Sequence, residues 1–307
     1  MSASIPFVYS DRYEADIGDH VFPTSKYRLV RTSLLELGAC GPEDFVESAP
    51  PAREDLALVH TAEYLDDLDG ARVTPRTVRS ELPITPSVIG AFRLAAGGSV
   101  LAARLAAERG AAVHIGGGLH HAFPDHAEGF CYVNDVAVAA RVALRDGLAR
   151  KVLVVDVDLH QGNGTAAVFR NDDDVFTFSI HQENNYPVKE KSDLDIGLAD
   201  GTGDDEYLAR LAAVLPGLRD RVRPGLVVYV AGADPYEDDR LGGLALTREG
   251  LRERDRLVFD TFGGAGVPVA VTLAGGYARA IADTVAIHTA TCIEAIRAAE
   301  IRGRRGP

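Results

Sequence analysis

The chain of 307 residues has only three cysteines and no tryptophan. Cys40, Cys131 and Cys292 are too few and too scattered to form the disulfide framework of a small secreted protein, so we expect a reducing, cytoplasmic compartment. No apolar run approaches the roughly 18 residues that a transmembrane helix needs. The N-terminal residues also lack the charged and apolar segments of a signal peptide. These absences argue against a membrane or secreted protein.

Basic residues are scarce relative to acidic ones. The chain has 45 Asp and Glu against 32 Lys and Arg, which gives a formal net charge of −13. Because nucleic-acid phosphates attract the opposite sign of charge, nucleic acid is not an expected partner. A basic substrate such as a lysine-rich peptide is compatible with this charge, although acidity also serves solubility alone.

Strand-like and helix-like segments alternate through most of the chain. Short apolar, β-branched runs predict strands at 7–9, 57–60, 112–115, 152–157, 175–180, 226–231 and 268–273. Longer amphipathic or Ala-rich segments predict helices at 26–37, 62–68, 87–109 with Ser87 as N-cap, 134–146, 204–222, 247–262 and 281–299. This alternation predicts an α/β protein with one domain over 1–307, in which helices cover both faces of a central parallel sheet.

Clusters of polar residues follow the carboxyl ends of five predicted strands. They begin at Gly116, Asp156, His181, Gly232 and Ala274. The carboxyl ends of parallel strands meet at one edge of a sheet, and open α/β sheets bind ligands there. We therefore expect five loops to converge on one crevice.

The segment 151–164, KVLVVDVDLHQGNG, carries the strongest signal for a metal. Asp156, Asp158 and His160 alternate, so an extended chain would point all three side chains to one face. Ionisable groups at the end of an apolar strand are costly to bury unless a partner such as a divalent metal neutralises them. Asp234, after another strand, would complete a catalytic site of two carboxylates and one imidazole, typical of Zn²⁺ and acceptable to Fe²⁺ or Mn²⁺. The alternative is a strand that ends in an ordinary polar loop.

Two further features indicate acid–base and electrophilic groups. His120 and His121 follow three glycines, and a loop could turn both imidazoles into a cleft as an acid/base pair near neutral pH. Tyr277 ends a Gly-Gly-Tyr turn, where its phenol could hydrogen-bond a substrate carbonyl oxygen as negative charge develops. The alternatives are two surface histidines and an aromatic residue of the core.

Six motifs in this order carry a family resemblance: GGGLHHA, GFCYVND, DVDLHQGNG, FSIHQ, AGAD and GGY. The chain resembles the histone deacetylase family, the arginase-like α/β metallohydrolases that remove acyl groups from lysine side chains. The resemblance extends from about Ser87 to the end and, more weakly, to VHTAEY at 59–64. HQGNG, DRLGGL at 239–244 and AGGY are most similar to class IV members and their bacterial relatives.

The resemblance implies a zinc-dependent hydrolase of Nε-acyl-lysine, acting on acetyl or longer acyl groups in proteins or peptides. Asp158, His160 and Asp234 match the zinc ligands. His121 matches the histidine that acts as general base and acid, and Tyr277 matches the tyrosine that polarises the carbonyl.

Other matched residues have supporting roles. His120 matches the histidine beside the base, and Asp156 matches the aspartate that orients His120. The residues that match the narrow substrate tunnel are Gly129, Phe130 and Tyr186. The residues that match a structural monovalent cation site, expected to hold K⁺, are Asp156, Asp158, His160, Ser179 and Ile180.

Asn163 departs from the family pattern, because many members have an aspartate there to pair with the second histidine. An amide orients an imidazole without adding charge, so it raises the histidine pKa less than a carboxylate would. The hypothesis is that His121 is neutral at pH 7 and well suited to act as a base.

Three other functions remain open from the sequence. Hydrolysis of a small acetylated amine such as an acetylpolyamine is the main alternative, although Glu183 and Glu237 are only guesses for an acidic gate. A binding module that had lost catalysis would lack a ligand or the tyrosine, and all of these are present. Arginase-type ureohydrolysis would need a two-metal site, which the His-His and Gly-Gly-Tyr motifs disfavour.

Overall fold

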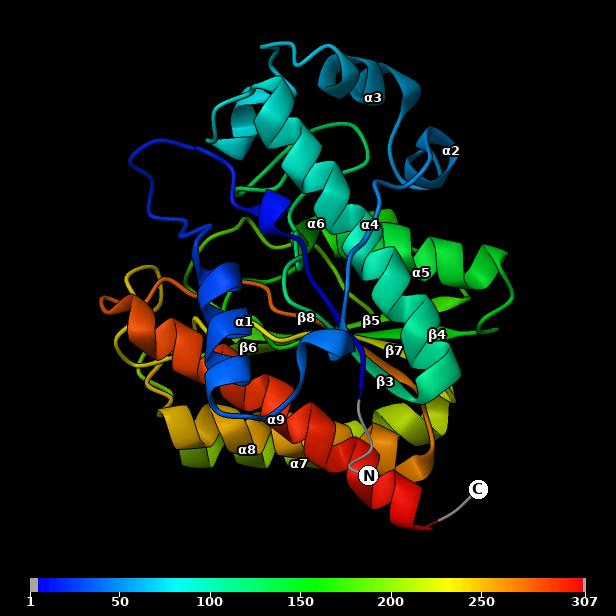
Figure 1. The fold of residues 1–307 in the computed structure, drawn as a ribbon, viewed down its shortest axis with the longest axis vertical. Coiled ribbons are helices and arrows are strands. Elements are labelled where there is room, and N and C mark those ends of the chain that lie inside the picture. Colours follow the sequence, from blue (N-terminus) through cyan, green and yellow to red (C-terminus); the bar gives the residue numbers. More distant parts are fainter. Residues whose placement is uncertain (1–4, 306–307) are drawn as a thin grey trace.

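Short runs of β-branched and aromatic residues form one eight-stranded, wholly parallel sheet in the computed structural model, which describes residues 5–305 (Figure 1). The strand order is β2-β1-β3-β8-β7-β4-β5-β6. The strands are β1 (Phe7–Val8), β2 (Phe45–Val46), β3 (Ala111–His114), β4 (Val152–Asp156), β5 (Val175–Gln182), β6 (Leu194–Leu198), β7 (Leu226–Val230) and β8 (Val269–Thr272). The inner strands β3, β4, β7 and β8 are buried along their whole length, as expected when both faces are covered.

Helices cover both faces of the sheet. The α-helices of the described chain are α1 (Lys26–Glu36), α2 (Arg53–Leu56), α3 (Ala62–Asp69), α4 (Pro86–Arg109), α5 (Asp135–Arg145), α6 (Asn163–Val168), α7 (Asp204–Val222), α8 (Arg248–Phe262) and α9 (Ile281–Arg305). In Figure 1, α4 and α5 pack together on one face, and α7, α8 and α9 lie side by side on the other. The predicted α/β architecture is confirmed, while the single-domain organisation over residues 1–307 stays a prediction.

The N-terminal third differs most from expectation. Residues 57–60 form no strand, because the amides of Ala57 and His60 donate back to Arg53 and Leu56 and continue the turns of α2. The N-cap of α4 is Thr85, whose Oγ1 accepts the Val88 amide at 3.2 Å. The predicted cap at Ser87 is therefore wrong by two residues, and the intervening proline occupies the first turn, where its missing N–H costs nothing.

Helix α4 is the one helix of the described residues that is long and apolar enough to cross a membrane. The prediction that the chain has no segment long and apolar enough to cross a membrane is therefore wrong for α4, by length and composition. The 18-residue window has a mean hydropathy of 1.4, and 72% of it is buried inside the fold. Contacts with β3, β8 and α5 account for this apolar character, as for the core helix of an α/β protein.

The sheet order brings the functional loops together. Strands β3, β8, β7, β4 and β5 are consecutive neighbours in the sheet, and each precedes one of the five polar clusters. Asp156, the last residue of β4, pairs in register with Ser179 on β5 and Val230 on β7. All five loops therefore start at the same edge of the sheet, as the sequence predicted.

Candidate active site

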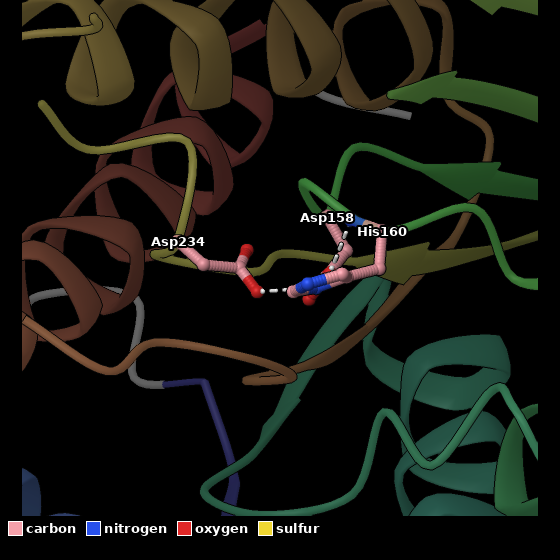
Figure 2. Close-up of side chains that lie close together, drawn as sticks. All are labelled: Asp158, His160 and Asp234. Atoms are coloured by element: carbon pink, nitrogen blue, oxygen red, sulfur yellow. Dashed lines mark hydrogen bonds and ion pairs between the residues drawn. The ribbon is translucent and has the colours of Figure 1, made fainter. Parts of the chain in front are cut away.

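A buried Asp–His–Asp group lies at this edge (Figure 2). Asp158 and His160 follow β4, and Asp234 follows β7. Nδ1 of His160 lies 3.3 Å from Oδ1 of Asp158 and 3.1 Å from Oδ2 of Asp234. One ligand atom from each residue lies within 4.8 Å of the other two. The three side chains that the sequence predicted as metal ligands therefore meet in space.

Backbone amides hold the two carboxylates in place. Oδ2 of Asp158 accepts the Gly275 amide at 2.9 Å, and Oδ1 accepts the His160 amide at 2.9 Å. Oδ1 of Asp234 accepts the Leu159 amide at 3.0 Å. A Cβ at Gly275 would lie 2.1 Å from Oδ2 of Asp234, so the backbone can approach the carboxylates this closely only at a glycine.

The group favours a positive charge between its members. Burial alone would lower the pKa of His160, but Asp158 and Asp234 outweigh burial and raise this pKa to about 10. A tetrahedral ion about 2.0–2.1 Å from each ligand places neighbouring ligand atoms roughly 3.3 Å apart, close to the separations found here. The residues present therefore fit a divalent metal ion.

A hydrogen-bonded row of side chains runs past this group. Nδ1 of His120 lies 2.8 Å from Oδ2 of Asp156, and Nε2 of His120 lies 3.1 Å from Nε2 of His121. Nδ1 of His121 lies 2.8 Å from Oδ1 of Asn163. The Gly-rich loop turns both imidazoles inward, and both are buried. The structure thus brings these four predicted residues together with the candidate metal ligands.

The two imidazoles differ in charge preference. Burial lowers the pKa of His120, but the nearby carboxylates of Asp156 and Asp158 outweigh it and raise this pKa to about 9. Burial and the positive charges of His120 and His160 hold the pKa of His121 well below its usual value. The lowered pKa of His121 agrees with the hypothesis that this imidazole is neutral at pH 7 and acts as a base.

A cavity of about 180 Å³ leads to these groups. Its lining residues are Glu81, His121, Gly129, Phe130, His160, Asn185, Tyr186, Leu241 and Tyr277. This volume is small beside the ~300–1,000 Å³ of pockets for drug-sized ligands. The cavity therefore suits a slender group, and the three predicted tunnel residues all line it.

A tight turn shapes one wall of the cavity. Gly129 and Phe130 have φ angles of 51° and 62°, and the flanking residues Glu128 and Cys131 exchange backbone hydrogen bonds of 3.1 and 2.9 Å. Positive φ at both central residues is typical of a type I′ turn. A Cβ at Gly129 would lie 2.6 Å from Oη of Tyr186, so a larger residue would block the cavity.

Tyr277 is held from its backbone and from one side of its ring. Its amide donates to Oδ2 of Asp239 at 2.7 Å. The ammonium of Lys26 lies 5.6 Å from the ring centroid and donates to the Ala274 carbonyl at 2.7 Å. Lys26 is fully buried, and burial lowers its pKa to about 8 against the opposing effect of nearby carboxylates. Sequence reasoning missed Lys26 and Asp239, because both act from segments distant in sequence.

Arg254 supports the backbone of the two loops that carry the candidate metal ligands. Its side chain is fully buried, and Nη1 donates to the carbonyl of Gly232 at 2.6 Å and that of Val157 at 3.4 Å. Nε and Nη2 donate to Oδ1 of Asp255 at 2.9 and 2.8 Å. One guanidinium thus connects the two loops that carry Asp158 and Asp234. Nothing in its helical sequence context signals this role.

The remaining predicted residues have mixed outcomes. Ser179 lies opposite Asp156 on the neighbouring strand, with Oγ 2.8 Å from Nδ1 of His181. Ile180 follows it in β5, and the monovalent cation site stays a prediction. The guessed acidic gate residues Glu183 and Glu237 do not line the cavity, whereas Glu81 does.

The fold and the site together define an α/β protein with a candidate metal centre at the carboxyl edge of a parallel sheet. A family-wide profile described as "Histone deacetylase domain" matches residues 20–292. The chain therefore belongs to the histone deacetylase family. The crystal structure of the HDA15 HD domain superposes with a TM-score of 0.77 at 28% identity, covering 94% of this chain and 89% of that one. This likeness confirms the predicted arginase-like fold.

Three relatives show how the similarity is distributed. An uncharacterized protein of Picosynechococcus sp. is 45% identical over 287 residues, which cover 92% of this chain and 96% of that protein. Histone deacetylase 2 of Arabidopsis thaliana is 31% identical over 302 residues, 92% of this chain and 78% of that one. A histone deacetylase-like amidohydrolase of Pseudomonas aeruginosa is 34% identical over 277 residues, 84% and 72% of the two chains. Membership of class IV in particular stays a prediction.

Proposed function

We propose that the protein is a zinc-dependent amidohydrolase that removes acetyl groups from Nε-acetyl-lysine in proteins or peptides. One observation carries the proposal. The buried group of Asp158, His160 and Asp234 lies beside a narrow cavity into which His121 and Tyr277 also project. The same ligands would also accept Fe²⁺.

The residues divide the work of amide hydrolysis among them. A divalent ion, when bound, lowers the pKa of water and polarises the substrate carbonyl. Nε2 of His121 accepts a proton from the attacking water, because burial and the nearby His120 and His160 keep the pKa of this imidazole low and so keep it neutral. The Tyr277 hydroxyl donates a hydrogen bond to the carbonyl oxygen as negative charge develops. The histidine pair then returns a proton to the leaving lysine amine.

The inner end of the site favours a short acyl group. A second cavity, lined by Phe22, Leu119 and Cys131 among others, shares His121 and Tyr277 with the first and measures about 20 Å³. A single water needs at least about 10–15 Å³ by this kind of measure. The space therefore suits an acetyl methyl, and a long fatty acyl chain would have to displace the surrounding side chains.

Hydrolysis of a small acetylated amine is the second candidate, and Glu81 favours it. This exposed carboxylate lines the cavity and could pair with a second ammonium of an acetylpolyamine. The same carboxylate would also attract a lysine-rich peptide, in keeping with the net charge of −13.

One set of assays tests both candidates. Matched lysine peptides carrying acetyl, octanoyl or myristoyl groups, together with acetylated polyamines, are incubated with zinc-loaded and chelator-treated protein. Zinc-dependent cleavage of acetyl peptide, faster than of the myristoyl peptide, is the expected result. Cleavage of polyamines alone would replace the main proposal with the second one. No cleavage of any substrate by zinc-loaded protein would reject both.

A further inference from the structure

A carboxylate lies directly behind the amide that contacts His121. Nδ2 of Asn163 donates to Oε1 of Glu128 at 2.8 Å, while Oδ1 of Asn163 faces Nδ1 of His121 at 2.8 Å. The Glu128 side chain is only 12% exposed. Asn163 thus bridges the imidazole and a nearly buried carboxylate.

This arrangement settles which way the amide points. A carboxylate only accepts hydrogen bonds, so Glu128 requires the NH₂ group of Asn163 on its side. The amide oxygen must then face His121, and only a protonated Nδ1 can donate to it. The lone pair of a neutral His121 is consequently on Nε2, the nitrogen that lies 3.1 Å from Nε2 of His120.

Glu128 is itself fixed from several directions. Its backbone is held by the turn described above, through Cys131. Its other oxygen, Oε2, pairs with Nη2 of Arg79 at 2.7 Å and lies 3.5 Å from Nε2 of His126. Because these partners occupy Oε2 and the backbone, Oε1 remains directed at Asn163.

We propose that Glu128 is a positioning residue, which orients the Asn163 amide and thereby keeps the proton of His121 on Nδ1 and its lone pair on Nε2. No carboxylate of the described residues contacts Nδ1 of this histidine directly. The Glu128 carboxylate lies behind Asn163 and acts on His121 through the amide. The effect on turnover rests on the proposed function, whereas the tautomer of His121 does not.

The first test is the tautomer itself, read from ring ¹⁵N shifts of protein labelled at its nine histidines. The His121 signals are identified with a His121→Asn variant. We expect a protonated Nδ1 in the wild type and in Glu128→Gln, whose side-chain oxygen still accepts from Asn163. Glu128→Ala should shift His121 towards the other tautomer, because the amide is then free to rotate. Glu183→Ala, which removes an exposed carboxylate that does not line the cavity, is the matched control. An unchanged tautomer in Glu128→Ala would overturn the proposal.

The second test is a double-mutant cycle on turnover of acetyl-lysine peptide. Glu128→Ala should lower kcat about 10-fold, the usual lower bound for loss of such an orienting partner, with KM little changed. Asn163→Asp alone should also be slow, since it places two carboxylates in contact. The double variant should recover activity, because an aspartate accepts the His121 proton from either oxygen and needs no orientation.

A double variant no faster than Glu128→Ala would contradict the proposal, provided that thermal melts show both variants folded. If the wild type cleaves no acyl-lysine, the proposed function fails. The ring ¹⁵N shifts then still decide the role of Glu128.

Discussion

Replacing Arg254 with alanine should destabilise the protein far more than removing an exposed arginine. The variant leaves the buried Asp255 carboxylate without its cation, and the Gly232 carbonyl without its donor. The hydroxyls of Tyr229 and Thr291 still donate to Asp255, both at 2.5 Å. These two hydrogen bonds reduce the loss of unfolding free energy but supply no positive charge.

The expected loss follows from the burial of this pair. Breaking a buried ion pair costs about 3–5 kcal/mol, and the retained hydroxyl bonds place Arg254→Ala near the lower end, about 3 kcal/mol. That is a large share of a typical unfolding free energy of about 5–15 kcal/mol. The matched control is Arg210→Ala, whose pair with Glu206 lies on the surface of α7 and should contribute no more than about 0.5 kcal/mol.

Urea unfolding of metal-free protein measures both variants. The chain has no tryptophan, so far-UV circular dichroism is the suitable signal. We also expect weaker zinc binding by Arg254→Ala, because Arg254 connects the loops that carry Asp158 and Asp234. A loss of free energy in Arg254→Ala no larger than in Arg210→Ala would refute the reasoning.

Three further predictions concern the histidine pair and the tyrosine. Against the effect of burial, Asp156 raises the pKa of His120 to about 9, above an unfolded value of about 6.5. The stability from this pair is therefore complete below pH ~6.5 and lost as the pH rises through about 9, and Asp156→Asn should flatten this pH dependence in urea titrations of metal-free protein. Burial holds the pKa of His121 low, so the pH below which kcat/KM falls should lie well below 6.5. Asn163→Asp should move this pH upward. An unchanged pH would count against His121 as the base. Tyr277→Phe keeps the ring but removes the hydroxyl, so kcat should fall about 10²–10³-fold with zinc affinity unchanged, and near-normal turnover would exclude the assigned role.

The central strands, and the polar clusters that follow them, could be predicted from local sequence. Strands β4 and β7 are continuous apolar runs because both faces are covered, and that pattern is visible without a structure. The edge strands β2 and β6 were not predicted. Strand β2 has only two residues, and β6 reads LDIGL with alternating exposure, so neither presents the apolar run of an inner strand.

The residues of the candidate site also differ in whether local sequence reveals them. The candidate metal ligands Asp158, His160 and Asp234 follow strands closely, so their position in the sequence revealed them, whereas Glu81 of the cavity lining follows no strand and was missed. Residues that act through another residue come from distant segments, as Lys26 does for Tyr277 and Glu128 for Asn163. No spacing rule connects such pairs, since only folding brings them together.

Titration of metal-free protein with zinc, followed by hydrolysis of an acetyl-lysine peptide, tests the central claim most directly. In the proposed function Asp158, His160 and Asp234 hold one zinc ion, so activity should rise from near zero and reach its plateau at one equivalent of zinc. Hydrolysis by the metal-free protein at the full rate would contradict the account, as would the absence of hydrolysis after one equivalent has bound.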